Sequence, residues 1–175
     1  VAMPTMATSN QMFERVSDVM ARRYPDTSAP VLLVHSQARW SREDPPQKMN
    51  IAREAIEDEQ ESVDAMTWFL PRKRSLLAPF GVGTVDQTFL SVLQTRHFFV
   101  RLFGLSHKTL VFDEVHAYDT YMSTLFQRLL GWLRAVGASV VILSATLPEK
   151  TRREMVWAYT GTDGALPEAP YPAIT

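Results

Sequence analysis

The chain has 175 residues, of which 46% are hydrophobic, so it can bury one core and we expect a single domain or part of one. Its 18 basic and 19 acidic residues nearly cancel, which excludes a surface that binds nucleic acid through bulk positive charge and limits any such contact to a local patch. The absence of cysteine excludes disulfides and thiolate metal sites, and no apolar run reaches the roughly eighteen residues of a membrane span, so we expect a cytoplasmic protein without a membrane partner.

The first part of the chain predicts one helix and one strand. Residues Thr8–Asn10 form a polar turn with good N-capping side chains, and apolar residues recur at helical spacing from Met12 to Met20, so a helix should follow the turn. The apolar run Val31–Val34 is typical of a strand covered on both faces of a parallel sheet. Between Arg39 and Asp64 the chain turns polar and acidic, which indicates a loop and a solvated helix.

The middle of the chain predicts a turn, a helix and a strand. Leu76–Phe80 and a glycine-containing turn over Gly81–Thr84 lead to Asp86, which we expect to cap a mostly apolar helix spanning Phe89–Phe103. Lys108–Phe112 then indicates a strand.

Helices and strands continue to alternate in the last third. We expect an amphipathic helix over Tyr118–Val136 ending near Gly137, a buried strand over Ser139–Leu143, and a helix over Glu149–Tyr159 that stops at Gly161. This alternation of apolar strands with helices predicts an α/β domain with a mainly parallel sheet flanked by helices.

Two acidic residues follow directly after one predicted strand. The segment Asp113-Glu114-Val115-His116 lies at the carboxyl end of the strand that finishes at Phe112, which is where open α/β sheets place their ligand crevice. Hydrolysis of a nucleoside triphosphate needs a carboxylate to hold Mg²⁺ and a group that orients the attacking water, and adjacent carboxylates can supply both. Acidic pairs are also common at strand ends without any catalytic role, so the pair alone does not decide.

A second polar cluster follows the next strand. Ser144-Ala145-Thr146 comes directly after Leu143, so two strand ends should present polar groups together. Small hydroxyl residues also make ordinary strand-to-helix turns, and Pro148 makes that alternative natural.

Together these segments resemble a known family. Val111–Asp119, with the sequence VFDEVHAYD, and Leu143–Pro148, with the sequence LSATLP, look like motifs II and III of superfamily 2 DExH helicases. The extended pattern resembles the CRISPR-associated helicase-nuclease of type I systems. Met3–Asn10 is similar to the motif Ia of that family, and Gly83–Gln87 is similar to the segment that precedes motif II, so the resemblance covers most of the chain.

The resemblance implies a RecA-like motor domain that binds ATP and Mg²⁺ and moves on single-stranded DNA. In that reading Asp113 coordinates Mg²⁺, in most cases through water, Glu114 activates the attacking water, and His116 links the nucleotide site to neighbouring motifs. Coupling of hydrolysis to DNA movement is assigned to three residues: Ser144, Ala145 and Thr146.

The resemblance also implies a DNA path along short hydroxyl side chains. The residues that would lie on this path are Thr5, Thr8, Ser9 and Thr84. Ordinary helix capping explains the same residue types equally well. The one dense basic cluster, Arg72-Lys73-Arg74, is better read as a solvated loop than as a nucleic-acid contact, and His35 receives no role.

Other parts of such a motor are not found in these 175 residues. No glycine-rich loop ending in Gly-Lys-Ser or Gly-Lys-Thr is present, so we expect residues 1–175 to be a partial first motor domain, with the phosphate-binding loop upstream and the second motor domain downstream. The four histidines show no metal-ligand spacing, so the nuclease domain of the family should also lie elsewhere in the parent chain.

The family further implies an RNA-guided surveillance complex as the partner that recruits the parent protein in antiviral defence. The chain alone should be nearly inactive as an ATPase, because its carboxylates cannot position a triphosphate without a phosphate cradle. Two alternatives stay open from the residues: another DExH helicase acting on DNA or RNA, and a non-catalytic α/β module that binds DNA or a protein.

Overall fold

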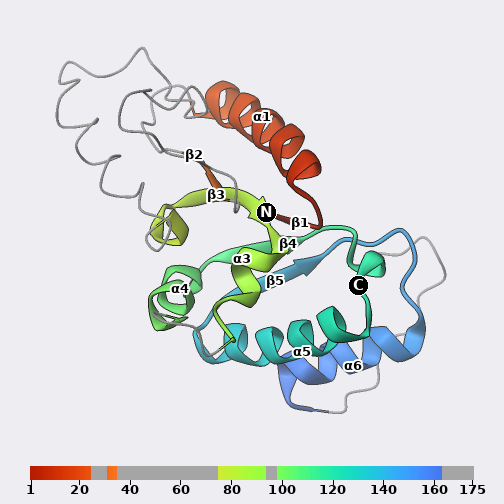
Figure 1. Ribbon diagram of the computed structural model, residues 1–175. Coiled ribbons are helices and arrows are strands. Elements are labelled where there is room, and N and C mark those ends of the chain that lie inside the picture. Colours follow the sequence, from red (N-terminus) through yellow and green to blue (C-terminus); the bar gives the residue numbers. More distant parts are fainter. Residues whose placement is uncertain (25–30, 35–74, 94–97, 163–175) are drawn as a thin grey trace.

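Five parallel strands form the centre of the molecule, which is described by a computed structural model over residues 1–24, 31–34, 75–93 and 98–162 (Figure 1). Their order across the sheet is β2-β3-β1-β4-β5, and each neighbouring pair is parallel. The strands are β1 (Ala2–Met3), β2 (Val31–Val34), β3 (Phe80–Thr84), β4 (Thr109–Phe112) and β5 (Ser139–Ile142). The predicted α/β class with a mainly parallel sheet is confirmed.

Helices cover both sides of this sheet. Figure 1 shows α1 on the opposite side of the sheet from α5 and α6. The helices and 3₁₀ turns are α1 (Met6–Arg23), η1 (Ser75–Leu77), α3 (Val85–Phe89), α4 (Phe98–Leu105), η2 (Val115–Ala117), α5 (Thr120–Ala135) and α6 (Glu149–Thr160).

The core is divided by the sheet. On the α1 side, Phe13 packs with apolar side chains of β2 and β3, among them Leu33 and Val82. On the α5 side, Phe112 of β4 meets Phe126 of α5 edge to face, with ring centroids 4.9 Å apart, and both side chains are fully buried. Aromatic pairs in this geometry add to the free energy gained from burial of their area. The end of β4 is therefore packed against α5.

Two predicted boundaries in the first half are wrong. The first helix begins at Met6 with Thr5 as its N-cap, so Thr8–Asn10 lie inside the helix and do not precede it. Gly81–Thr84 is part of β3 and is not a turn. The glycine at position 83 has a packing reason, because a Cβ there would lie 2.0 Å from the carbonyl oxygen of Val34 in β2.

The helix predicted over Phe89–Phe103 is also corrected. The structure has α3, which ends at Phe89, and α4, which begins at Phe98. Asp86 lies in the first turn of α3, and the N-cap position belongs to Thr84, whose side chain makes no capping hydrogen bond. The apolar pattern in the sequence predicts one helix although it includes parts of two. Hydrophobic periodicity does not show where one helix ends and the next begins.

The strand β5 has the predicted position but not the predicted burial. Its residues alternate between exposed and half-buried, and Val141 is 42% exposed. Within the described residues β5 pairs only with β4, which leaves it at one edge of the sheet. A parallel strand is normally covered on both faces, so this edge is the least protected part of the sheet.

The ends of the remaining predicted elements lie within two residues of the ends found in the structure. They are β2, β4, α5 and α6. The helix α6 ends at Thr160, and its C-cap Gly161 has a φ of 72°, the left-handed conformation that glycine adopts at little cost. The predictions for Arg39–Asp64, for His35 and for Arg72-Lys73-Arg74 lie outside the described residues.

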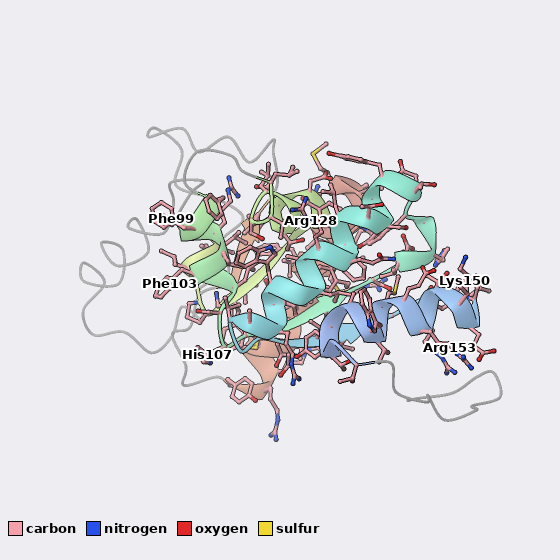
Figure 2. All side chains as sticks on the ribbon, turned by 90° about the horizontal axis from the view of Figure 1, so that it is seen from below. Phe99, Phe103, His107, Arg128, Lys150 and Arg153 are labelled. Carbon is pink, nitrogen blue, oxygen red and sulfur yellow. The ribbon has the colours of Figure 1, made fainter. Side chains whose placement is uncertain are left out.

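Two phenylalanines of α4 are exposed. Figure 2 shows Phe99 and Phe103 on the outer side of α4, where they are 61% and 71% exposed. In the part of the chain that the structure describes, none of the helices has the length and apolar character needed to cross a membrane.

Candidate functional site

The candidate site lies where β4 and β5 end, and a single residue joins these two ends. The backbone N–H of Leu143 donates to the carbonyl oxygen of Phe112 at 2.8 Å, and the carbonyl oxygen of Leu143 accepts from the N–H of Val115 at 3.4 Å. Asp113 and Glu114 lie between these two hydrogen bonds. The two acidic residues therefore make no main-chain hydrogen bond to β5, while the residues on both sides of them bond to Leu143.

Asp113 is held in place through its backbone and its own side chain. Its N–H donates to the carbonyl oxygen of Ala2 in β1 at 3.0 Å, and its Oδ1 accepts from the N–H of Glu114 at 2.9 Å. The residue is half-buried. One carboxylate oxygen is thus used to orient the group, and Oδ2 has no hydrogen bond within the described ranges.

Glu114 has an unusual backbone conformation for a residue with a side chain. Its φ of 55° and ψ of 38° place it in the left-handed region, where a non-glycine residue costs on the order of 1–3 kcal/mol. The residue is exposed, and its carboxylate has no hydrogen bond or ion pair with any residue that the structure describes. This residue is the N-cap of η2, and its exposed carboxylate is accessible to a ligand.

His116 and Ser144 connect the two polar clusters. Ser144 Oγ lies 3.3 Å from His116 Nδ1, and it also donates to the carbonyl oxygen of Thr146 at 2.8 Å. A hydroxyl has one proton, so when Oγ donates to Thr146 it accepts from the histidine, which must then carry its proton on Nδ1. Ala145 and Thr146 are exposed beside this pair. The predicted juxtaposition of the two strand ends is therefore present.

Two further residues of the segment were given no role from the sequence. Asp119 is the N-cap of α5, because its Oδ1 accepts from the N–H of Met122 at 2.8 Å. An aspartate directly before an amphipathic helix is a recognisable capping signal. Tyr118 packs its ring against Phe89 and Phe126, and its buried Oη has no hydrogen-bond partner within the described ranges. No sequence signal distinguishes such a buried hydroxyl.

The hydroxyl residues assigned to a DNA path behave differently. Thr5 and Thr8 form a reciprocal capping box, in which Thr5 Oγ1 accepts from the N–H of Thr8 and Thr8 Oγ1 accepts from the N–H of Thr5. Ser9 is fully buried and donates to the carbonyl oxygen of Thr5 at 2.8 Å, and Thr84 is 5% exposed. The DNA contacts stay predictions, and burial argues against Ser9 and Thr84 as side-chain contacts in this conformation.

All these residues lie along the same edge of the sheet. Because every strand pair is parallel, the turn after β1, the end of β3 and the polar clusters after β4 and β5 share the carboxyl edge. A ligand on this edge can contact several of them together.

The donor set indicates which metal this edge suits. Within the described residues, no group of three or more His, Cys, Asp or Glu side chains could hold a metal ion by itself. Mg²⁺ does not need such a cage, because it usually binds through one or two carboxylates, several waters and the phosphates of a substrate. An exposed carboxylate at Glu114 and an oriented one at Asp113 fit this mode. They do not fit a structural zinc site.

Comparisons with curated proteins and with solved structures find similar proteins, although no family model matches the chain. The CRISPR-associated endonuclease/helicase Cas3 of Thermus thermophilus is 43% identical over 99% of this chain, and the chain spans 19% of the length of that protein.

Solved structures agree with this similarity. The crystal structure of T. fusca Cas3 with ATP matches with a TM-score of 0.74 and 40% identity, over 90% of this chain and 17% of that one. A chain in a CRISPR RNA-guided surveillance complex, described as pre-nicking, matches at 31% identity with a TM-score of 0.50, over 91% of this chain and 17% of that chain.

Proposed function

The chain belongs to the Cas3 family of CRISPR-associated helicase-nucleases, and from this membership we propose that it is part of an ATP-driven motor that moves on single-stranded DNA. The observation that carries the proposal is the joined pair of strand ends. They bring two carboxylates, a histidine and a serine to one edge of a parallel sheet. Nucleotide binding by a similar protein, T. fusca Cas3 with ATP, supports ATP as the nucleotide.

In this proposal Glu114 is the catalytic base. Its exposed carboxylate would accept a proton from, or orient, the water that attacks the terminal phosphate of ATP. The backbone at this position is left-handed, and the side chain is exposed to solvent. A carboxylate without a protein partner is also free to act on a water molecule.

Asp113 would hold Mg²⁺, through water, beside the phosphates. Bound Mg²⁺ supplies neutralisation of the charge that develops on the transferred phosphoryl group. Asp113 would hold the ion in a fixed direction, because its N–H bonds to β1 and its Oδ1 accepts from the N–H of Glu114. The adjacent positions of Asp113 and Glu114 give one carboxylate to the cation and the other to the water.

The His116–Ser144 contact would couple hydrolysis to DNA. It is the side-chain link between the residues after β4 and those after β5, and Ser144 in turn fixes the carbonyl of Thr146. A change at the nucleotide would therefore move the Ser144-Ala145-Thr146 turn. We propose that DNA lies along the same edge of the sheet, near Thr5 and Thr8.

The proposal extends to a longer parent protein. We propose that residues 1–175 form part of the first motor domain, and that the phosphate-binding loop, the second motor domain and the nuclease domain belong to other segments. The partner would be an RNA-guided surveillance complex, as the similarity to a chain of such a complex supports. Alone, this chain would hydrolyse ATP poorly.

The test is ATP hydrolysis by the full-length protein that contains this chain, with and without single-stranded DNA. Turnover that depends on DNA and is lost in Glu114→Gln is the expected result. Turnover that persists in this variant would remove Glu114 from catalysis. An absence of turnover in the unaltered protein would favour a non-catalytic binding module, and stimulation by RNA but not DNA would favour another DExH helicase.

A further inference from the structure

Tyr118 lies in the segment 113–119, and neither the packing nor the proposed function accounts for its hydroxyl group. Its Oη is buried and has no hydrogen-bond partner within the described ranges. A buried donor left unpaired costs on the order of 1–3 kcal/mol, so such groups are rare in folded proteins and call for an explanation.

The packing of the ring fixes where this hydroxyl points. The Tyr118 ring lies edge to face against Phe89 of α3, with centroids 6.0 Å apart, and against Phe126 of α5, with centroids 5.4 Å apart. Both phenylalanines are buried, and the N–H of Tyr118 donates to the carbonyl oxygen of Val115 at 3.2 Å. The side chain therefore cannot rotate away to find water without loss of these contacts.

Two carboxylates act on this hydroxyl. Burial raises the pKa of Tyr118, and the negative charges of Asp86 and Asp113 raise it further. The phenol is thus a neutral donor that lies within electrostatic range of both carboxylates and has no hydrogen bond to either of them. Asp86 is exposed and can be solvated by water. Asp113 is half-buried, and its Oδ2 has no hydrogen bond within the described ranges.

We propose that Tyr118 is a positioning residue for Asp113, whose carboxylate receives the Tyr118 hydroxyl as a hydrogen-bond donor when the nucleotide site is occupied. The packing of the ring against Phe89 and Phe126 holds the donor in place before a nucleotide binds. In this proposal, rotation of the Asp113 carboxylate when a cation binds brings one of its oxygens to the hydroxyl. This inference rests on the proposed function, because it assigns a partner to the proposed Mg²⁺ ligand.

The hydroxyl can be removed without disturbing the packing. Tyr118→Phe keeps the ring between Phe89 and Phe126 and deletes only Oη, so it should leave the thermal midpoint of the empty full-length protein unchanged or slightly higher. Tyr121→Phe on α5 is the matched control, because Tyr121 is 65% exposed. A lower midpoint for Tyr118→Phe than for the control would show that the hydroxyl already has a partner in the empty state, which would overturn the proposal.

Binding of Mg-ATP then tests the role of the hydroxyl. With Glu114→Gln as the background, so that ATP is not consumed, Tyr118→Phe should weaken Mg-ATP binding roughly five- to tenfold, the size of one net hydrogen bond. Binding of ATP in EDTA should be equal in both proteins, because Asp113 acts only through the cation. Equal Mg-ATP affinities, or equal losses with and without Mg²⁺, would overturn the assignment.

A double-mutant cycle identifies the acceptor. When Asp113→Asn is already present, Tyr118→Phe should have little further effect on Mg-ATP binding. If Asp86→Asn reproduces the loss instead, the acceptor is Asp86 and the assignment to Asp113 is wrong. These outcomes are separate from the proposed function. A protein that hydrolyses ATP, loses turnover in Glu114→Gln and binds Mg-ATP equally with Tyr118 or Phe would refute only the inference about Tyr118.

Discussion

Two turns at the carboxyl edge of the sheet carry clusters of polar side chains, and they use those side chains in opposite ways. In the turn from β1 into α1, the hydroxyls of Thr5, Thr8 and Ser9 are all engaged in local hydrogen bonds that cap the helix. In the turn after β4, the carboxylate of Glu114 has no partner within the described residues and one oxygen of Asp113 is also unused.

The difference follows from the chemistry of the two side chains. A hydroxyl both donates and accepts, so neighbouring hydroxyls and amides can satisfy one another inside a single helical turn. A carboxylate only accepts and carries a charge, so it needs a donor or a cation from elsewhere. A cluster of threonines can therefore satisfy its own hydrogen bonds, whereas an adjacent pair of acidic residues without cationic partners relies on water or on a ligand.

The largest expected effect comes from the unpaired carboxylate. Glu114→Gln in the full-length protein should lower ATP turnover by about 10²–10⁴-fold, because an amide cannot act as the base. Stability should not change, since the carboxylate has no partner to lose. Steady-state ATPase assays and thermal melts provide the two measurements. Glu14→Gln, an exposed glutamate on α1, is the control and should affect neither.

A smaller effect is expected at the contact that joins the two strand ends. His116→Ala and Ser144→Ala should each reduce the stimulation of ATP turnover by DNA, by roughly tenfold, the value of one hydrogen bond to a charged or polar partner. The double variant should be no worse than either single variant, because both remove the same link. Fully additive losses would mean that the 3.3 Å contact carries no coupling.

Substitution of Thr5 in the turn from β1 into α1 should lower the stability of the first turn of α1. Thr5→Ala removes the acceptor of the capping box and should cost about 1 kcal/mol, seen as faster hydrogen exchange of the first-turn amides of α1. Thr5→Ser should restore slow exchange. DNA affinity is measured in parallel. A loss of DNA-binding free energy larger than the loss of helix-capping free energy would show that the hydroxyl of Thr5 also binds phosphate. That result would weaken the contrast between the two turns.

The smallest expected change in stability concerns the left-handed backbone of Glu114. Glu114→Gly should leave the thermal midpoint unchanged or raise stability by up to about 1 kcal/mol, because glycine adopts a φ of 55° without strain, while ATP turnover is lost. The control is Glu14→Gly inside α1, where glycine should destabilise by about 1 kcal/mol. Destabilisation of equal size at both positions would show that the conformation at Glu114 stores no strain.

Sequence patterns predicted the sheet and the polar strand ends, and they failed where spatial neighbours decide the structure. The run Val31–Val34 and the segment after Phe112 were placed correctly, because both are local signals. Gly81–Thr84 was taken for a turn, since the close approach of β2 that requires Gly83 is visible only in three dimensions. The exposure of β5 and the unpaired hydroxyl of Tyr118 likewise depend on neighbours that no periodicity shows.

The link between the two strand ends through Leu143 has a consequence for how this segment can evolve. Both of its hydrogen bonds use main-chain atoms, and its side chain is 46% exposed. The connection therefore does not depend on which side chain is present, and substitutions at position 143 should preserve both hydrogen bonds. Proline is the exception, because it lacks the N–H that bonds to Phe112. The main chain can thus fix the spacing of the two polar clusters whatever side chain stands between them.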